Sequence, residues 1–287
     1  MKTLKQNRIR YSYQGQFYQF VITMICTLGA LFALIPLFIT IINSLKIDDE
    51  VAKNVFSLPS NQIFSAIANN YATAWNAIGT YFTRTIIVAI VGAVCVTLLG
   101  ALLAYILVFK DFYLKNFVFM LFIAVLLIPS IIGYPILVPL MRDTFKLGDT
   151  YAGLLIPYIG GNQVGAMFLF RTFFSAQPKA IYESARLDGA SELKIFFTIT
   201  VPLAIPILLY FFISAFSGIY NEYLYSSLIL DSKLILMPKM YSLVDSQNIK
   251  YGSMYAMYVI SSVPLIVTTF ISMKYFTSGE FASGMKL

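Results

Sequence analysis

Long apolar runs, separated by short charged segments, make up most of the chain. Six stretches contain no Asp, Glu, Lys or Arg: residues 11–45, 85–109, 116–141, 150–170, 195–221 and 251–273. Each can hold the roughly 20 apolar residues that a helix needs to cross the hydrocarbon core of a bilayer. The pattern predicts an all-α, polytopic membrane protein with a single transmembrane domain. Its six spans are expected at about residues 17–42, 86–109, 116–141, 151–170, 201–222 and 252–273.

A seventh uncharged stretch, residues 54–83, is not expected to enter the membrane. Asn, Ser and Gln residues are spread along it, and such side chains are costly in hydrocarbon. We expect an extramembrane loop with short helices there.

Composition supports a membrane protein and disfavours most kinds of hydrolase. The chain is 59% hydrophobic and 11% charged, whereas soluble domains carry about 25% charged residues. It contains no histidine, which removes the commonest general base and metal ligand. Cys26 and Cys95 lie in apolar runs, so we interpret both as packing residues. Neither a catalytic residue nor a metal site is expected.

The distribution of charge predicts the orientation. Six spans place both termini on one side, together with 12 basic and 5 acidic residues, while the other side carries 8 of each. Excess Lys and Arg mark the cytoplasmic face, so both termini are predicted to be cytoplasmic. The basic residues are scattered rather than clustered, so no nucleic-acid partner is expected. No ionisable residue lies deep in a predicted span, which argues against an ion-coupled secondary carrier.

The cytoplasmic loop at residues 171–200 has the local signals of a helix, a sharp turn and a second helix. Pro178 can start the first helix, Gly189 can end it in the left-handed conformation, and Ser191 can cap the second. Ser184 and Ala185 are small, which permits close approach of another protein, and Ile181, Tyr182 and Ala185 offer an apolar stripe. Two interpretations stay open at this point: a helix that docks in a partner's socket, and an amphipathic helix on the lipid surface.

The same loop carries a long spaced motif. Glu183-Ser184-Ala185 is followed at fixed intervals by Gly189, Ile199, Val201 and Pro202. This spacing is similar to E-A-A-x3-G-x9-I-x-L-P, the EAA motif of bacterial ABC importer permeases; Ser184 and Val201 depart from it conservatively. Three further features resemble the carbohydrate, maltose-type branch of that family: Ala190 after Asp188-Gly189, the segment Asn221-Glu222-Tyr223-Leu224, and Gly279, Gly284 and Lys286 in the tail. The similarity covers about residues 56–286.

The resemblance implies partners and roles. In such importers a second permease subunit completes the pathway, a cytoplasmic ATPase dimer receives the EAA helix, and an extracytoplasmic solute-binding protein delivers sugar. It implies a multi-pass subunit of the bacterial cytoplasmic membrane, in contact with lipid, that couples ATPase closure to alternating access. The ATPase-coupling residues are then Glu183, Ser184, Ala185, Arg186, Asp188, Gly189 and Pro202, and the C-terminal tail contact is Gly279, Gly284 and Lys286.

The chain has no G-x-x-x-x-G-K-[ST] loop, so it is expected to bind no cofactor and to leave ATP and Mg²⁺ to the ATPase. An oligosaccharide is the expected substrate. The alternatives are an ABC permease for a non-sugar solute and, less favoured, an ion-coupled secondary carrier.

Other functional positions are less well defined. Asn162, Gln163, Tyr134 and Asn221 are candidates for the substrate pathway, with packing roles as the favoured alternative. The resemblance also places the outer loop, residues 223–250, toward the binding protein. Pro202 and Pro206 predict a bend where the cytoplasmic loop meets the fifth span, and Pro129, Pro135 and Pro139 predict a bent third span.

Overall fold

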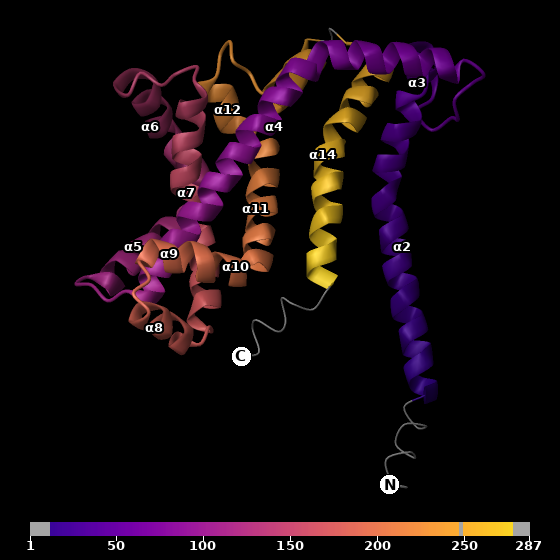
Figure 1. Cartoon of the computed structure of the whole chain (residues 1–287). Helices are drawn as coiled ribbons and strands as arrows, with labels where there is room; N and C mark the ends of the chain where they lie inside the picture. Colours follow the sequence, from indigo (N-terminus) through magenta and orange to yellow (C-terminus); the bar gives the residue numbers. More distant parts are fainter. Residues whose placement is uncertain (1–11, 247–248, 278–287) are drawn as a thin grey trace. The chain divides into compact units, whose positions relative to one another are not determined.

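The computed structural model describes residues 12–246 and 249–277, and all regular structure in these ranges is helical (Figure 1). The chain divides into two compact units. Unit 1 comprises the residues up to Trp75 together with Ile249–Ile260, and unit 2 comprises Asn76–Asn248 together with the residues from Ser261 onward. The helices α4 (Ile63–Phe109) and α14 (Tyr251–Thr277) contribute to both units.

Within the described residues, four helices are long and apolar enough to cross a membrane: α2 (Ser12–Ser44), α4, α7 (Tyr151–Ser175) and α14. Two bent pairs raise the number to six if each pair counts as one span. The all-α multi-helix architecture is therefore confirmed, while the count of six spans stays a prediction. The cytoplasmic placement of the termini also stays a prediction, and the residues before Ser12 and after Thr277 lie outside the described ranges.

The bends fall where proline interrupts the backbone ladder. A 90° bend separates α5 (Lys115–Leu126) from the segment Ser130–Thr144, which contains η1 (Ser130–Gly133), α6 (Tyr134–Pro139) and η2 (Leu140–Thr144). An 84° bend separates Glu192–Leu203 from α11 (Ile205–Tyr220). Pro206 has no N–H to bond to the carbonyl of Pro202, so the helix breaks at Ala204 between them. Both predicted bends are thus confirmed.

The segment at residues 54–83 differs from the prediction of a loop with short helices. From Ile63 onward it is part of the single 47-residue helix α4. Asn and Ser side chains disfavour a position in hydrocarbon, but they do not prevent helix formation, and no proline occurs between Ile63 and Phe109. The polar residues of this segment therefore bear on its position relative to the membrane and leave the helix unbroken.

A buried polar cluster holds unit 1 together. The ammonium group of Lys46, whose side chain is fully buried, donates to the Asn43 side-chain oxygen at 3.0 Å and to the carbonyl oxygens of Asn54 and Val55 at 3.1 and 3.2 Å. The Asn70 amide donates to the carbonyl oxygens of Ser44 and Lys46 at 3.0 and 2.8 Å. These bonds tie the end of α2 and the turn that precedes α3 (Asp48–Lys53) to α4 and to the segment that follows α3.

Unit 2 contains the two loops that sequence analysis connected with function. The helices α4 and α7 approach closely, since a Cβ atom on Gly100 would lie 2.3 Å from that of Ala166. The helices α8 (Lys179–Leu187), α9 (Glu192–Ile195) and α10 (Val201–Leu203) gather at one end of this unit, and α6 and α12 (Leu224–Ile229) lie at the other (Figure 1). The two loops are therefore separated by the length of the helices between them.

Candidate functional site: the coupling loop and the outer loop

The predicted helix–turn–helix is present at the expected residues. Pro178 is the N-cap of α8, and the backbone turns after Leu187 through Gly189, whose φ is +78°. Only glycine adopts this left-handed conformation at little cost. The Ser191 hydroxyl then accepts a hydrogen bond of 3.4 Å from the Lys194 N–H at the start of α9. The loop predicted at residues 171–200 begins later than expected, because α7 continues to Ser175. We call residues 178–200 the coupling loop and α8 the coupling helix, after their predicted role.

The coupling helix has an exposed face and a buried one. Ala180, Glu183, Ser184 and Leu187 are all exposed and are spaced i, i+3, i+4 and i+7, so they share one side of the helix. The Leu187 side chain is 89% exposed. The shared exposed face therefore carries one carboxylate, two small residues and one apolar side chain.

The buried face corrects one part of the sequence interpretation. Tyr182 was expected in the apolar docking stripe, but its side chain is fully buried. Its ring stacks on that of Phe109, the last residue of α4, with a centroid separation of 3.9 Å. The ring of Tyr105, one turn earlier on α4, lies 6.4 Å away. Tyr182 therefore attaches the coupling helix to α4 and contributes nothing to the exposed face.

The charged residues of the loop also divide into two groups. Arg186 does not pair with Glu183, three residues before it, but with Glu192, whose Oε1 atom lies 3.0 Å from the Arg186 Nε. Lys110, just after α4, contacts the same oxygen at 2.6 Å. Glu183 makes no hydrogen bond or ion pair with any other residue that the structure describes. Asp188, at the C-cap of α8, is exposed as well.

The remaining predicted coupling residues lie around this helix. Ser184 is exposed, Ala185 is half-buried and accepts a 3.0 Å hydrogen bond from the Ala190 N–H, and Pro202 is exposed in α10. The predicted tail contacts Gly279, Gly284 and Lys286 lie outside the described residues.

The pathway candidates are distributed over three helices. Asn162 in α7 and Asn221 after α11 are both exposed, and each side-chain amide donates to a carbonyl oxygen four residues earlier, at Tyr158 and Ser217 respectively. Gln163 is half-buried in α7. Tyr134 at the start of α6 is half-buried, and its ring lies 5.3 Å from that of Tyr225 in α12.

The helices α7 and α11 meet near both asparagines. A Cβ atom on Gly218 would lie 2.5 Å from the Tyr158 hydroxyl, so these two residues are in close contact. Asn162 lies one turn after Tyr158 on α7, and Asn221 lies directly after α11, so the two asparagines belong to helices in contact with each other. Tyr134 lies elsewhere and packs against α12.

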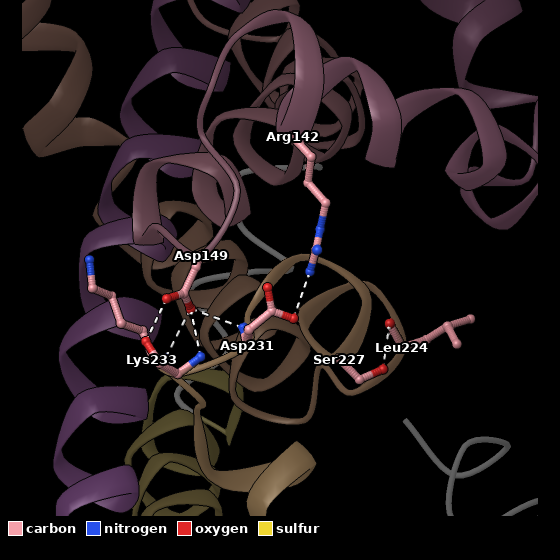
Figure 2. A network of polar contacts seen from close by, with 7 residues as sticks. Arg142, Asp149, Leu224, Ser227, Asp231 and Lys233 are labelled. Carbon is pink, nitrogen blue, oxygen red and sulfur yellow. Dashed lines mark hydrogen bonds and ion pairs between the residues drawn. The ribbon is translucent and has the colours of Figure 1, made fainter.

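The outer loop is ordered by two carboxylates. Glu222, part of the Asn221–Leu224 segment, accepts hydrogen bonds of 2.7 Å from the backbone N–H groups of Tyr225 and Ser226 and so caps α12. Asp149 accepts hydrogen bonds of 2.9–3.0 Å from the backbone N–H groups of Asp231, Ser232 and Lys233 (Figure 2). Glu222 therefore has a local structural role.

The Asp149 carboxyl group strongly favours its ionised form. The Ser232 hydroxyl and the three backbone N–H groups hold the pKa of Asp149 well below its usual range. Its backbone has a φ of +52°, a conformation that aspartate tolerates better than most residues. Beside it, Arg142 forms an ion pair of 2.9 Å with Asp231 (Figure 2). The segment 230–235 is thus fixed against the turn that precedes α7.

Several of these residues escaped sequence analysis. Glu192 and its partner Lys110 are 82 positions apart in the sequence, and no local signal connects them. Asp149 and the segment 231–233 are likewise distant in sequence. Leu187 could have been found, because the i, i+3, i+4, i+7 spacing from Ala180 is visible in the sequence.

Comparison with known proteins identifies a set of related chains. Residues 96–279 match the family described as "binding-protein-dependent transport system inner membrane component". The diacetylchitobiose uptake system permease protein NgcG of Streptomyces coelicolor is 31% identical over 248 residues, which cover 84% of this chain and 80% of that protein. The arabinooligosaccharides transport system permease protein AraQ of Bacillus subtilis is 27% identical, with coverage of 97% and 99%.

Two further matches extend the comparison. The melibiose/raffinose/stachyose import permease protein MelC of Bacillus subtilis is 30% identical, with coverage of 93% of this chain and 96% of that protein. Among solved structures, a bacterial ABC transporter involved in the import of the acidic polysaccharide alginate contains a chain that superposes with a TM-score of 0.81 at 22% identity. The superposition covers 93% of this chain and 99% of that chain, and it shows a shared fold.

Proposed function

The chain belongs to the family of binding-protein-dependent transport system inner membrane components, and from this premise we propose that it works with a second permease subunit, a separate cytoplasmic ATPase dimer and a solute-binding protein. It is a multi-pass permease subunit of a bacterial ABC importer for sugars and not a catalytic enzyme. Its relatives are named for diacetylchitobiose, arabinooligosaccharides and the melibiose/raffinose/stachyose group. An oligosaccharide is therefore the proposed cargo.

The exposed face of the coupling helix is the observation that carries this proposal. Glu183, Ser184 and Leu187 present a charge, a small residue and an apolar side chain on a helix whose other side is held by the chain itself. A surface of this kind fits a cleft on an ATPase subunit. ATP and Mg²⁺ then bind to the ATPase subunits, and this chain binds no cofactor.

Force from the ATPase reaches the membrane through short helical segments. Beyond α9 the chain continues through η3 (Phe196–Thr200) and α10 to the 84° bend at Ala204, and then enters α11. Proline at 202 and 206 fixes this corner. ATPase closure would tilt α11 as a rigid body and so alternate access to the pathway.

Polar groups on the outside of otherwise apolar helices support a pathway along α7, α11 and α14. Asn162 and Asn221 are exposed in the single chain, and polar side chains in membrane helices face a protein partner or a wet cavity. A cavity of about 280 Å³ lies between α11 and α14, and most of its lining residues carry hydroxyl groups: Tyr210, Ser214, Ser217, Thr268, Thr269 and Ser272. The hydroxyl groups of Thr268, Thr269 and Ser272 donate to carbonyl oxygens of α14 itself, so the cavity offers a sugar a largely apolar wall with a few polar positions.

Reconstitution tests the proposed function. Proteoliposomes that contain this chain, the neighbouring permease and the ATPase, with the binding protein added outside, are expected to accumulate at least one member of a radiolabelled panel of raffinose, stachyose, diacetylchitobiose and arabinotriose. Uptake must stop when ATP, the ATPase or the binding protein is omitted. ATP-independent uptake, or import of amino acids in place of sugars, would overturn the proposal.

In the same vesicles Asn162→Ala or Asn221→Ala should raise the KM for uptake, and an unchanged KM for both would remove these residues from the pathway.

A further inference from the structure

We infer that Glu192 is a positioning residue that links the coupling helix to the end of α4, so that ATPase movement enters the second predicted span as well as α11. The inference rests on the proposed function of the coupling loop. It concerns a residue outside the exposed docking face, and it adds a second route for force to the one that passes through α10 and the bend at Ala204.

Both carboxylate oxygens of Glu192 are engaged, and their partners come from two other elements. Oε1 contacts the Lys110 ammonium group at 2.6 Å and the Arg186 Nε at 3.0 Å. Oε2 accepts a 2.6 Å hydrogen bond from the Tyr105 hydroxyl. Tyr105 belongs to α4, Lys110 directly follows it, and Arg186 lies in the last turn of the coupling helix. One side chain on α9 therefore joins α4 to α8.

The surroundings of this carboxylate make the link stiff. The side chains of Lys110, Arg186 and Glu192 are 33–40% exposed, so they are shielded from water over most of their surface. The Tyr105 ring packs against Phe109 and Phe196 with centroid separations of 5.2 and 5.5 Å. Arg186 also donates a 3.4 Å hydrogen bond to the Phe109 carbonyl oxygen. Aromatic packing holds the charged groups in one arrangement and weakens the screening between them.

The charge balance makes Glu192 different from an ordinary surface ion pair. One carboxylate separates two cations, and without its charge Lys110 and Arg186 would repel each other across the junction between α4 and the coupling helix. Neutralisation of the Glu192 carboxylate should therefore loosen the junction between α4 and the coupling helix and leave the exposed face of α8 intact. The ATPase would still dock and hydrolyse ATP, but its movement would reach α4 poorly.

The test is Glu192→Gln in the complete importer, reconstituted with the panel oligosaccharide that the wild type imports best. We expect wild-type copurification of the ATPase subunits, retained ATP hydrolysis, and about a tenfold fall in sugar imported per ATP, within the range usual for coupling between sites. The matched control is Asp111→Asn, which neutralises a fully exposed carboxylate paired with Lys115 at 3.0 Å in the adjacent turn. It should leave the ratio unchanged.

A charge exchange tests positioning separately from folding. Glu192→Lys combined with Lys110→Glu keeps one carboxylate and two cations at the junction, and it should recover part of the lost coupling. If Glu192→Gln does not accumulate in the membrane, Tyr105→Phe removes only one hydrogen bond to the carboxylate and should lower the ratio by a smaller factor.

Two results would overturn the inference. One is an unchanged ratio of sugar to ATP in both Glu192→Gln and Tyr105→Phe. The other is a parallel loss of copurification, ATP hydrolysis and uptake, which would assign Glu192 a purely structural role. Failure of the wild-type importer to couple ATP to sugar uptake would instead refute the proposed function, so the two failures are distinguishable.

Discussion

Glu183→Lys is expected to abolish binding-protein-dependent uptake, with a loss of at least about 100-fold, while the chain still accumulates in the membrane. Glu183 is exposed and makes no internal hydrogen bond or ion pair with the described residues, so its replacement should not destabilise the fold. On the docking face the new charge would be buried against the ATPase without a partner. Such a mismatch costs about 3 kcal/mol or more, which corresponds to a factor of at least about 100 in affinity.

Copurification of the ATPase with affinity-tagged permease measures the effect directly. The matched control is Asp49→Lys, which makes the same charge reversal at an exposed carboxylate of α3 in unit 1. The control should bind the ATPase normally. Normal ATPase binding by Glu183→Lys would show that Glu183 does not lie on the docking surface.

Tyr182→Ala is expected to have the second large effect, for the opposite reason. The Tyr182 ring is fully buried and stacked on Phe109, so its removal leaves a cavity between the coupling helix and α4. Truncation of a buried aromatic residue costs about 3–5 kcal/mol. The coupling helix should detach locally, and limited proteolysis of membrane vesicles should cleave the coupling loop at least about tenfold faster than in the wild type.

Two variants separate burial from docking. Tyr182→Phe keeps the stacked ring and should retain nearly all of the protease resistance. Leu187→Ala alters the exposed face and should weaken ATPase binding without a change in proteolysis of the isolated permease. Protease resistance of Tyr182→Ala equal to the wild type would contradict the anchoring role of Tyr182.

Sequence patterns predicted local features of this protein well. Pro178, Gly189 and Ser191 act within a few residues of their own positions, so their effect on the backbone can be deduced from chain-local chemistry. The bends at Pro129 and between Pro202 and Pro206 follow from a missing N–H group for the same reason. Glu183 and Ser184 are exposed, and the docking interpretation of the motif stays a prediction.

Contacts between distant segments could not be deduced in this way. Tyr182 is an aromatic residue in a predicted docking helix, so the sequence alone suggests an exposed side chain. Only its contact with Phe109, 73 residues earlier, shows that the ring packs against α4. The same holds for Glu192 with Lys110 and for Asp149 with residues 231–233. The long helix α4 was missed because polarity predicts location relative to the membrane and does not predict where a helix starts.

The most direct measurement is the sidedness of the coupling helix. In a chain with Cys26→Ala and Cys95→Ala, Ser184→Cys places a single thiol on the exposed face of α8. A membrane-impermeant maleimide should modify this thiol in inside-out vesicles stripped of the ATPase, and bound ATPase should block the reaction. Modification from the outside of intact spheroplasts would place the coupling helix on the wrong side of the membrane and contradict force transmission from a cytoplasmic ATPase.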